Sequence, residues 1–123
     1  TESTELSLSD TLGIEAGDMH RMVENANWLS YCLREISKHI ERSDLLEEFG
    51  DLRKRIVYGI REELLDLVRV KGIGRVRARI LFKHNIKNLD DLAKIPVNKL
   101  AEIDKIGLTI ANNIKAELKK VRY

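Results

Sequence analysis

The chain has 123 residues, 43% of them hydrophobic and 34% charged, which suits a globular protein with one modest core or two small ones. Its single cysteine, Cys32, excludes an internal disulfide framework and a multi-cysteine metal site, and no apolar run approaches the roughly 20 residues that span a bilayer. With one proline and few aromatic residues, the composition predicts an all-α, intracellular protein that does not enter a membrane.

Charge is distributed unevenly along the chain. Residues 1–68 carry eight Lys or Arg against fifteen Asp or Glu, a net charge of −7, whereas residues 69–123 carry fourteen against five, a net charge of +9. Between Leu67 and Leu89 there are seven basic residues and no acidic one. Such a stretch fits a phosphate-contacting surface better than a balanced, solvated one, so the second half is predicted to bind a polyanion.

The acidic half opens with a short polar segment, residues 1–13, and Gly13 and Gly17 are expected to bracket a loop before the first long helix. Apolar residues then recur at spacings of mostly three and four from Met19 to Ile40, and Asp18 is the expected N-cap. This pattern predicts a long amphipathic helix whose apolar stripe lies in a core.

Arg21 and Trp28 lie off this stripe. At 100° per residue they project from nearly the same side of the helix, about 110° to 130° from the centre of the stripe and roughly 10 Å apart along the axis. A cation and an indole so placed can stack on nucleobases or grip a strand without reading its sequence. Alternatively, Trp28 packs against another helix of a bundle, and helical geometry leaves both interpretations open.

A second helical pattern begins at Ser43 and is expected to continue to Val68, with a bend near Gly59. The helices predict a partial helical bundle over residues 1–60. A compact domain of the helix-hairpin-helix type is expected over residues 61–123.

This second domain begins with a glycine-containing turn between two helical patterns, Val70-Lys71-Gly72-Ile73-Gly74. Because glycine tolerates positive φ, Gly72 and Gly74 are both expected to adopt it, with Ile73 filling the angle between the helices. The first amides of the following helix would then face outward, where unpaired N–H groups and the helix dipole favour an anion.

Positive side chains surround this turn. Lys71 lies within it, and Arg75, Arg79 and Lys83 follow at one-turn intervals along one side of a helix expected at residues 75–85. We predict that these four residues contact backbone phosphate. The alternative is a turn that only joins two packed helices and carries solvated arginines.

A weaker copy of the turn follows 33 residues later, at Asp104-Lys105-Ile106-Gly107. Gly74 and Gly107 are each preceded by an isoleucine and followed four positions later by an alanine. Because the copy has Lys105 in place of Gly72 and no arginine at the start of its helix, we expect it to be mainly structural.

Together these residues resemble the C-terminal region of archaeal superfamily-two DNA helicases of the Ski-two-like group. Gly17-Asp18 followed by Arg21 and Trp28 is similar to the start of the family's ratchet helix. Gly72-Ile73-Gly74-Arg75 with Arg77-Ala78-Arg79 is similar to its small C-terminal domain. The resemblance covers essentially the whole chain.

The resemblance implies a role for each motif. Arg21 and Trp28 would stack on bases of the translocating strand, while Lys71, Arg75 and Arg79 would contact phosphate. Arg77 points to the other side of its helix and could face the motor domains.

The resemblance also implies a non-catalytic part of an ATP-dependent DNA helicase that acts in replication-fork repair. Its partners would be single-stranded and forked DNA, the motor domains of the parent chain, and replication or repair proteins, in a cytoplasmic, nucleoid-associated setting. Neither a Gly-x-x-x-x-Gly-Lys-Ser/Thr loop nor an Asp-Glu motor motif is present. ATP and Mg are therefore expected only in the motor domains, and this segment is expected to need no cofactor or metal.

Two other functions fit a hairpin of this kind. In a helix-hairpin-helix glycosylase or lyase, a lysine stands where this chain has Val76, and His20, His39 and His84 are too dispersed for catalysis or metal binding. We therefore expect no catalysis by this chain. The alternative that stays open is a stand-alone DNA-binding or protein-interaction module of a repair complex.

Overall fold

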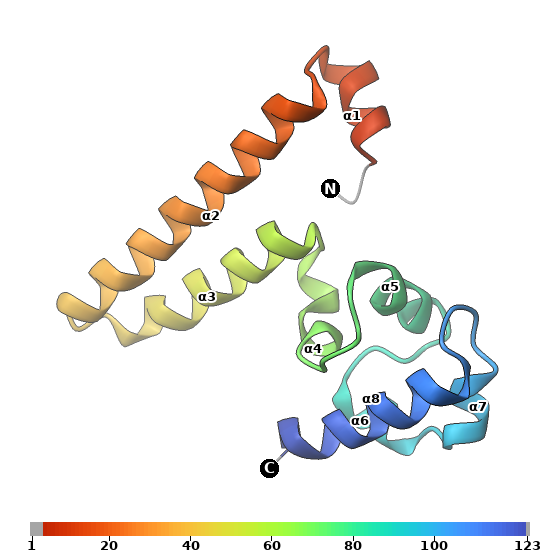
Figure 1. Ribbon diagram of the computed structural model, residues 1–123. Helices are drawn as coiled ribbons and strands as arrows, with labels where there is room; N and C mark the ends of the chain where they lie inside the picture. Colours follow the sequence, from red (N-terminus) through yellow and green to blue (C-terminus); the bar gives the residue numbers. More distant parts are fainter. Residues whose placement is uncertain (1–3, 123) are drawn as a thin grey trace. The chain divides into compact units, whose positions relative to one another are not determined.

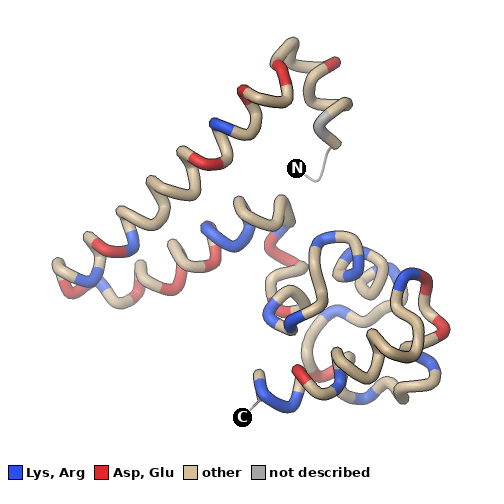
Figure 2. Tube along the Cα trace, viewed as in Figure 1, with Lys and Arg blue, Asp and Glu red and all other residues tan. Residues whose placement is uncertain are grey.

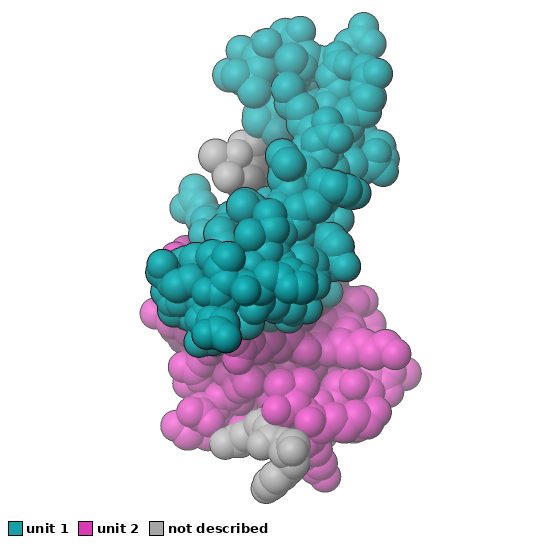
Figure 3. Space-filling model, turned by 90° about the vertical axis from the view of Figure 1, so that its left-hand side faces the viewer, with its two compact units in different colours: residues 1–61 teal, residues 62–123 magenta. Residues whose placement is uncertain are grey.

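The computed structural model describes residues 4–122, which form helices joined by short turns and include no strand (Figure 1). The all-α prediction is confirmed. The chain divides into two compact units, Thr1–Arg61 and Glu62–Tyr123 (Figure 3). Within residues 4–122, no helix combines the length and the apolar character needed to cross a membrane.

The first unit begins with a short helix that the sequence did not predict, α1 (Glu5–Leu12). The side chain of Thr4 accepts a hydrogen bond from the amide of Ser7 and caps the first turn, and Gly13 ends the helix at a φ of 66°. The loop expected between Gly13 and Gly17 is confirmed in part, because the chain is non-helical over residues 13–15 and α2 already begins at Ala16. Residues 1–3 lie outside the described residues.

A helical pair, α2 (Ala16–His39) and α3 (Ser43–Tyr58), makes up the rest of the first unit. The buried face of α2 carries small polar residues, Ser30 and Ser37, whose hydroxyls donate to the carbonyls of Ala26 and Leu33 in the preceding turn. Small side chains let two helix backbones approach closely. The N-terminus of α2 lies slightly earlier than expected, with Glu15 as N-cap and Asp18 in the first turn.

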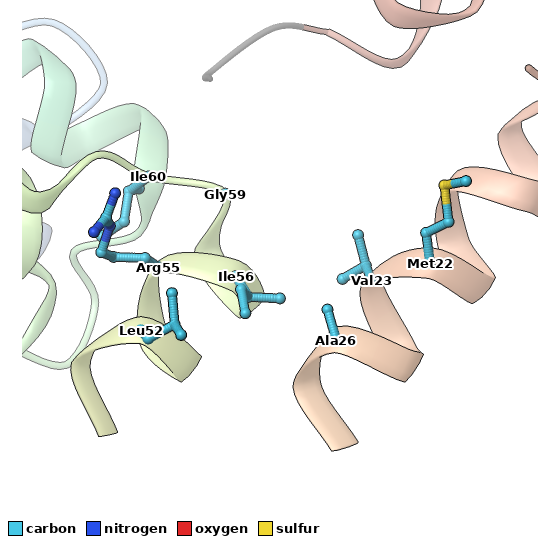
Figure 4. Close-up of a pocket in the computed structure, with 8 residues that line it drawn as sticks. All are labelled: Met22, Val23, Ala26, Leu52, Arg55, Ile56, Gly59 and Ile60. Atoms are coloured by element: carbon cyan, nitrogen blue, oxygen red, sulfur yellow. The ribbon is translucent and has the colours of Figure 1, made fainter. Parts of the chain in front are cut away.

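The apolar stripe of α2 was predicted to lie in a core, and this prediction is wrong. Its larger side chains are more than half exposed: Met22, Leu29, Ile36 and Ile40. The reason is that α3 packs on the neighbouring face of α2, which carries Ser30 and Ser37, so that most of the stripe faces outward. Figure 4 shows a hollow at one end of the pair, where Val23 and Ala26 of α2 lie opposite Ile56 of α3.

Helix α3 ends at Gly59 and does not continue to Val68 as expected. Gly59 has a φ of 63°, its amide donates to the carbonyl of Ile56, and the amide of Ile60 donates to the carbonyl of Arg55. This pair of bonds is the Schellman arrangement, which satisfies the last carbonyls of a helix and turns the chain away. A bend was predicted where the helix in fact terminates.

The second unit consists of six short elements. They are η1 (Glu62–Leu64), α4 (Leu65–Val68), α5 (Arg75–Lys83), α6 (Leu89–Lys94), α7 (Val97–Ala101) and α8 (Gly107–Arg122). Each contributes to one apolar core, and the largest fully buried side chains all belong to this unit: Leu64, Leu67, Val70, Leu81, Leu92, Leu100 and Ile114. The sequence predicted α5 and α8 because a glycine-containing turn precedes each of them, but it did not predict a new start at η1 and α4, where one helix was expected to continue to Val68.

Candidate nucleic-acid interface

The first hairpin is the turn at residues 70–74 between α4 and α5. The amide of Ile73 donates to the carbonyl of Val70 at 3.0 Å, and Gly72 has a φ of 95°, a conformation that residues with a Cβ rarely adopt. Ile73 is buried, with 2% of its surface exposed. The expected positive φ of Gly72 and the packing role of Ile73 are therefore confirmed.

Gly74 does not adopt positive φ, so this expectation is wrong. It is the N-cap of α5, with a φ of −92° and a ψ of −171°, which is extended backbone that any residue can adopt. A Cβ built at Gly74 would meet no heavy atom within 4 Å, and no side chain caps the first turn of α5. The effect of glycine here is to leave the helix N-terminus open to approach.

The basic residues around the first hairpin do not share one environment. Lys71 and Lys83 are exposed, whereas Arg75 is half-buried. Arg79 is only 25% exposed, because its guanidinium lies 3.0 Å from the Glu63 carboxylate and 5.4 Å from the centre of the Phe82 ring. The predicted stripe of three cations on α5 therefore has an ion-paired residue in its middle.

The second unit is also less basic than residues 69–123, because Glu62, Glu63 and Asp66 belong to it. Because the second unit begins at Glu62, it contains fourteen Lys or Arg against eight Asp or Glu (Figure 2). Lys71 likewise has an acidic neighbour, since a hydrogen bond from Lys120 and the charge of Lys71 both lower the pKa of Glu117. Two of the basic residues around the first hairpin, Lys71 and Arg79, thus have acidic neighbours in space, although the sequence from Leu67 to Leu89 contains no acidic residue.

Arg77 has a contact that the sequence did not predict. Its guanidinium donates to the carbonyl of Gly72 at 2.9 Å and to the carbonyl of Lys105 at 3.1 Å. It therefore joins the first hairpin to the second. Helical spacing separates Arg77 from Arg75 and Arg79, but it does not predict the partners of Arg77, the second of which lies 28 residues away.

The second hairpin, at residues 103–107, is built in the same way. The amide of Ile106 donates to the carbonyl of Ile103 at 3.2 Å, and Ile106 is buried. Lys105 has a φ of 61°, so a non-glycine residue occupies the position that corresponds to Gly72. Its helix, α8, presents Leu108 at 58% exposure where α5 carries Arg75.

Lys115 is a cation with a structural role. Its ammonium donates to the carbonyls of Leu92 and Ala93 at 2.6 and 3.0 Å, and burial lowers its pKa. These bonds join α8 to the C-terminal part of α6, where the last carbonyls of a helix need donors. Lys115 is consequently not part of the basic surface.

On α2, Arg21 and Trp28 are both exposed. Trp28 is 65% exposed, which confirms that it lies off the packed face, and Arg21 forms an ion pair with Asp18 one turn earlier. Around Trp28 the sequence missed further residues: Tyr31 from α2 and Arg53 from α3 line the same hollow. Within residues 4–122, no group of three or more His, Cys, Asp and Glu side chains could hold a metal ion.

Comparison with known families covers both units. Residues 1–59 match the family described as "Archaeal helicase, domain 4", and residues 64–120 match the "SAM-like Helix-hairpin-helix tandem". The first part of the chain thus matches an archaeal helicase domain and the second part a helix-hairpin-helix tandem. This result confirms the resemblance drawn from Arg21, Trp28 and the first hairpin.

Proteins similar to this chain include three named ATP-dependent DNA helicase Hel308. Those of Thermococcus kodakarensis and Pyrococcus horikoshii are each 37% identical over 118 residues, which is 95% of this chain. The Pyrococcus abyssi protein is 37% identical over 114 residues, or 92% of this chain. The matched region is 10%, 16% and 16% of the respective relatives' lengths.

Proposed function

We propose that this segment is a non-catalytic, DNA-binding part of an ATP-dependent DNA helicase that acts in replication-fork repair. The observation that carries the proposal is the open N-terminus of α5. It has no side-chain cap, has open space at Gly74, and is flanked by exposed Lys71 and half-buried Arg75. Backbone amides, the helix dipole and two cations converge there on a position suited to a phosphate.

This arrangement would bind DNA without reading its sequence. Amides and cations contact phosphate oxygens, which every nucleotide presents, so the hairpin would set position and not base preference. The tandem helix-hairpin-helix family match of residues 64–120 supports the same use of the turn.

Helix α2 would add contacts to single-stranded DNA. Trp28 is exposed and lies beside further aromatic and polar residues, and base stacking on such a ring contributes about 1 to 3 kcal/mol per base. In the parent protein, we propose that the motor domains cover the exposed apolar stripe of Met22, Leu29 and Ile36. Single-stranded and forked DNA are the proposed nucleic-acid partners.

The direct test is the binding of this chain to single-stranded, duplex and forked DNA at two salt concentrations. We expect affinity to fall steeply with salt, with a log-log slope whose magnitude grows by roughly 0.7 to 0.9 per phosphate contact. Trp28, the single tryptophan, should change its fluorescence on addition of single-stranded DNA. Binding that hardly responds to salt would contradict the phosphate site.

A second candidate is a protein-interaction module of a repair complex. It is favoured by one observation, the exposed apolar stripe of α2. An interface of that kind would change little with salt, because apolar burial releases no counterions. The same titration therefore separates the two functions.

A further inference from the structure

A hollow next to Trp28 gathers residues from both helices of the first unit. We call it the Trp28 hollow, and its lining consists of Glu24, Asn25, Asn27, Trp28, Tyr31 and Arg53. All except Arg53 belong to α2. The proposed function uses only Trp28 and, further along the helix, Arg21, so the other residues have no assigned role.

Arg53 holds one wall of the Trp28 hollow in place. Its Nε donates to Oδ1 of Asn27 at 2.8 Å, and its guanidinium carbon lies 5.4 Å from the centre of the Tyr31 ring. A guanidinium that is both hydrogen-bonded and packed on a ring restricts that ring's rotamers. Tyr31 nevertheless stays 45% exposed, so its ring is accessible to a ligand.

Trp28 and Tyr31 are close enough to act on one strand. They are three residues apart on α2, which places their Cβ atoms about 5 to 6 Å apart on the helix surface. Two exposed rings at this spacing form a stacking surface of the sort that binds successive bases. An amide from Asn25 or Asn27 can supply hydrogen bonds to a base edge.

The hollow has no excess of positive charge to attract a phosphate, because the Glu24 carboxylate offsets the Arg53 guanidinium, which already binds Asn27. Glu24 lines the hollow with a carboxylate, which lies 3.2 Å from Nε2 of His20, and a carboxylate repels a phosphate group. The Watson–Crick edge of an unpaired base, thymine included, offers an N–H group from which a carboxylate or an amide oxygen can accept a hydrogen bond. The ligand that fits these groups is therefore a nucleobase and not the sugar-phosphate backbone.

We propose that the Trp28 hollow binds a base of single-stranded DNA, with Tyr31 as a second stacking residue and Arg53 as the residue that positions it. The proposal rests on the proposed function, because it assumes that the strand lies along α2. It adds a contact that Arg21 and Trp28 do not provide.

The test measures the affinity of the whole chain for a fluorescently labelled oligothymidylate. Tyr31→Ala should weaken binding roughly 5- to 150-fold, the range expected for one lost base-aromatic stack, while leaving the salt slope unchanged because no phosphate contact is lost. Tyr31→Phe should bind like the unmodified chain. Tyr31→Leu keeps apolar volume without a ring and should weaken binding as well, which separates stacking from packing if the alanine variant unfolds.

Arg53→Lys tests whether Arg53 positions the Tyr31 ring, because lysine keeps the positive charge but lacks the flat guanidinium group. It should weaken binding by a smaller factor, and this effect should disappear in the Tyr31→Ala background. If Tyr31→Ala and Tyr31→Leu bind DNA normally while Trp28→Ala binds more weakly, the inference about Tyr31 is wrong. The proposed contact of Trp28 with single-stranded DNA is then retained. If Trp28→Ala also binds normally, the proposed role of α2 fails instead.

Discussion

The two hairpins of the second unit share a core and differ at the surface. At an offset of 33 residues, each buried residue of the first hairpin and α5 has a buried counterpart in the second hairpin and α8. The pairs are Val70 and Ile103, Ile73 and Ile106, Ala78 and Ala111, Leu81 and Ile114. Packing therefore treats the two copies alike.

The surface positions of the same repeat are not alike. Arg75, Arg79 and Lys83 of α5 correspond to Leu108, Asn112 and Ala116 of α8. A second difference lies in the backbone, because Gly74 is extended whereas Gly107 has a φ of 64°. The hairpin is thus a structural unit in both copies, and under the proposed function DNA binding depends on the side chains that the first copy carries on its surface.

The largest expected effect tests the shared core. Ile73→Ala and Ile106→Ala should each lower the free energy of unfolding by about 2 to 5 kcal/mol, since each removes a buried side chain of the same shape. Chemical denaturation followed by circular dichroism measures both. If one variant is destabilised and the other is not, the two copies are not equivalent in packing.

A smaller effect separates the two glycines of the first hairpin. Gly72→Ala should cost about 1 to 3 kcal/mol of stability, because a Cβ is strained at a φ of 95°. Gly74→Ser should cost no stability, since serine is a preferred N-cap and a Cβ there has open space. Its hydroxyl should compete for the first amides of α5 and weaken DNA binding several-fold.

The measurement for the glycine pair is thermal stability and DNA affinity on the same samples. A Gly74→Ser protein that is stable and binds DNA like the unmodified chain would show that no phosphate reaches the start of α5. Gly72→Ala supplies the control for a purely structural loss.

The smallest effect concerns the ion pair within the basic stripe. Glu63→Gln removes the carboxylate 3.0 Å from Arg79 and should change stability by less than about 1 kcal/mol. DNA affinity should rise by a factor of about 2 to 5, because a competing anion is gone. Glu62→Gln is the matched control, since it changes net charge equally without removing the partner of Arg79; an equal gain in both would mean that only net charge matters.

The second unit was predicted better than the first, because its sequence signals are local whereas packing in the first unit depends on contacts between distant residues. Turn chemistry and a repeat are local, so the hairpin at Gly72 and its copy at Lys105 could be read directly. The stripe of α2 shows which side is apolar but not what covers it, and α3 packs on the neighbouring side at Ser30 and Ser37.

The candidate site could be predicted only in part for the same reason. Positions of charge along α5 follow from helical spacing, but the partners of Arg77 and Arg79 lie 28 and 16 residues away. Tyr31 was missed because nothing local marks it, and its packing against Arg53 depends on how α3 returns along α2. Pairing between distant elements is information that periodicity does not contain.

In the proposed function, DNA phosphate is contacted by the surface side chains of the first hairpin and not by the buried core that both hairpins share. The most direct measurement replaces Arg75 and Lys83 by their counterparts from the second copy, as Arg75→Leu with Lys83→Ala, and records DNA affinity over a range of salt concentrations. Lys94→Ala with Lys99→Ala removes the same charge elsewhere on the unit. The account predicts a salt slope smaller by roughly 1.4 to 1.8 in the first variant and nearly unchanged in the second. Equal slopes in the two variants would contradict it.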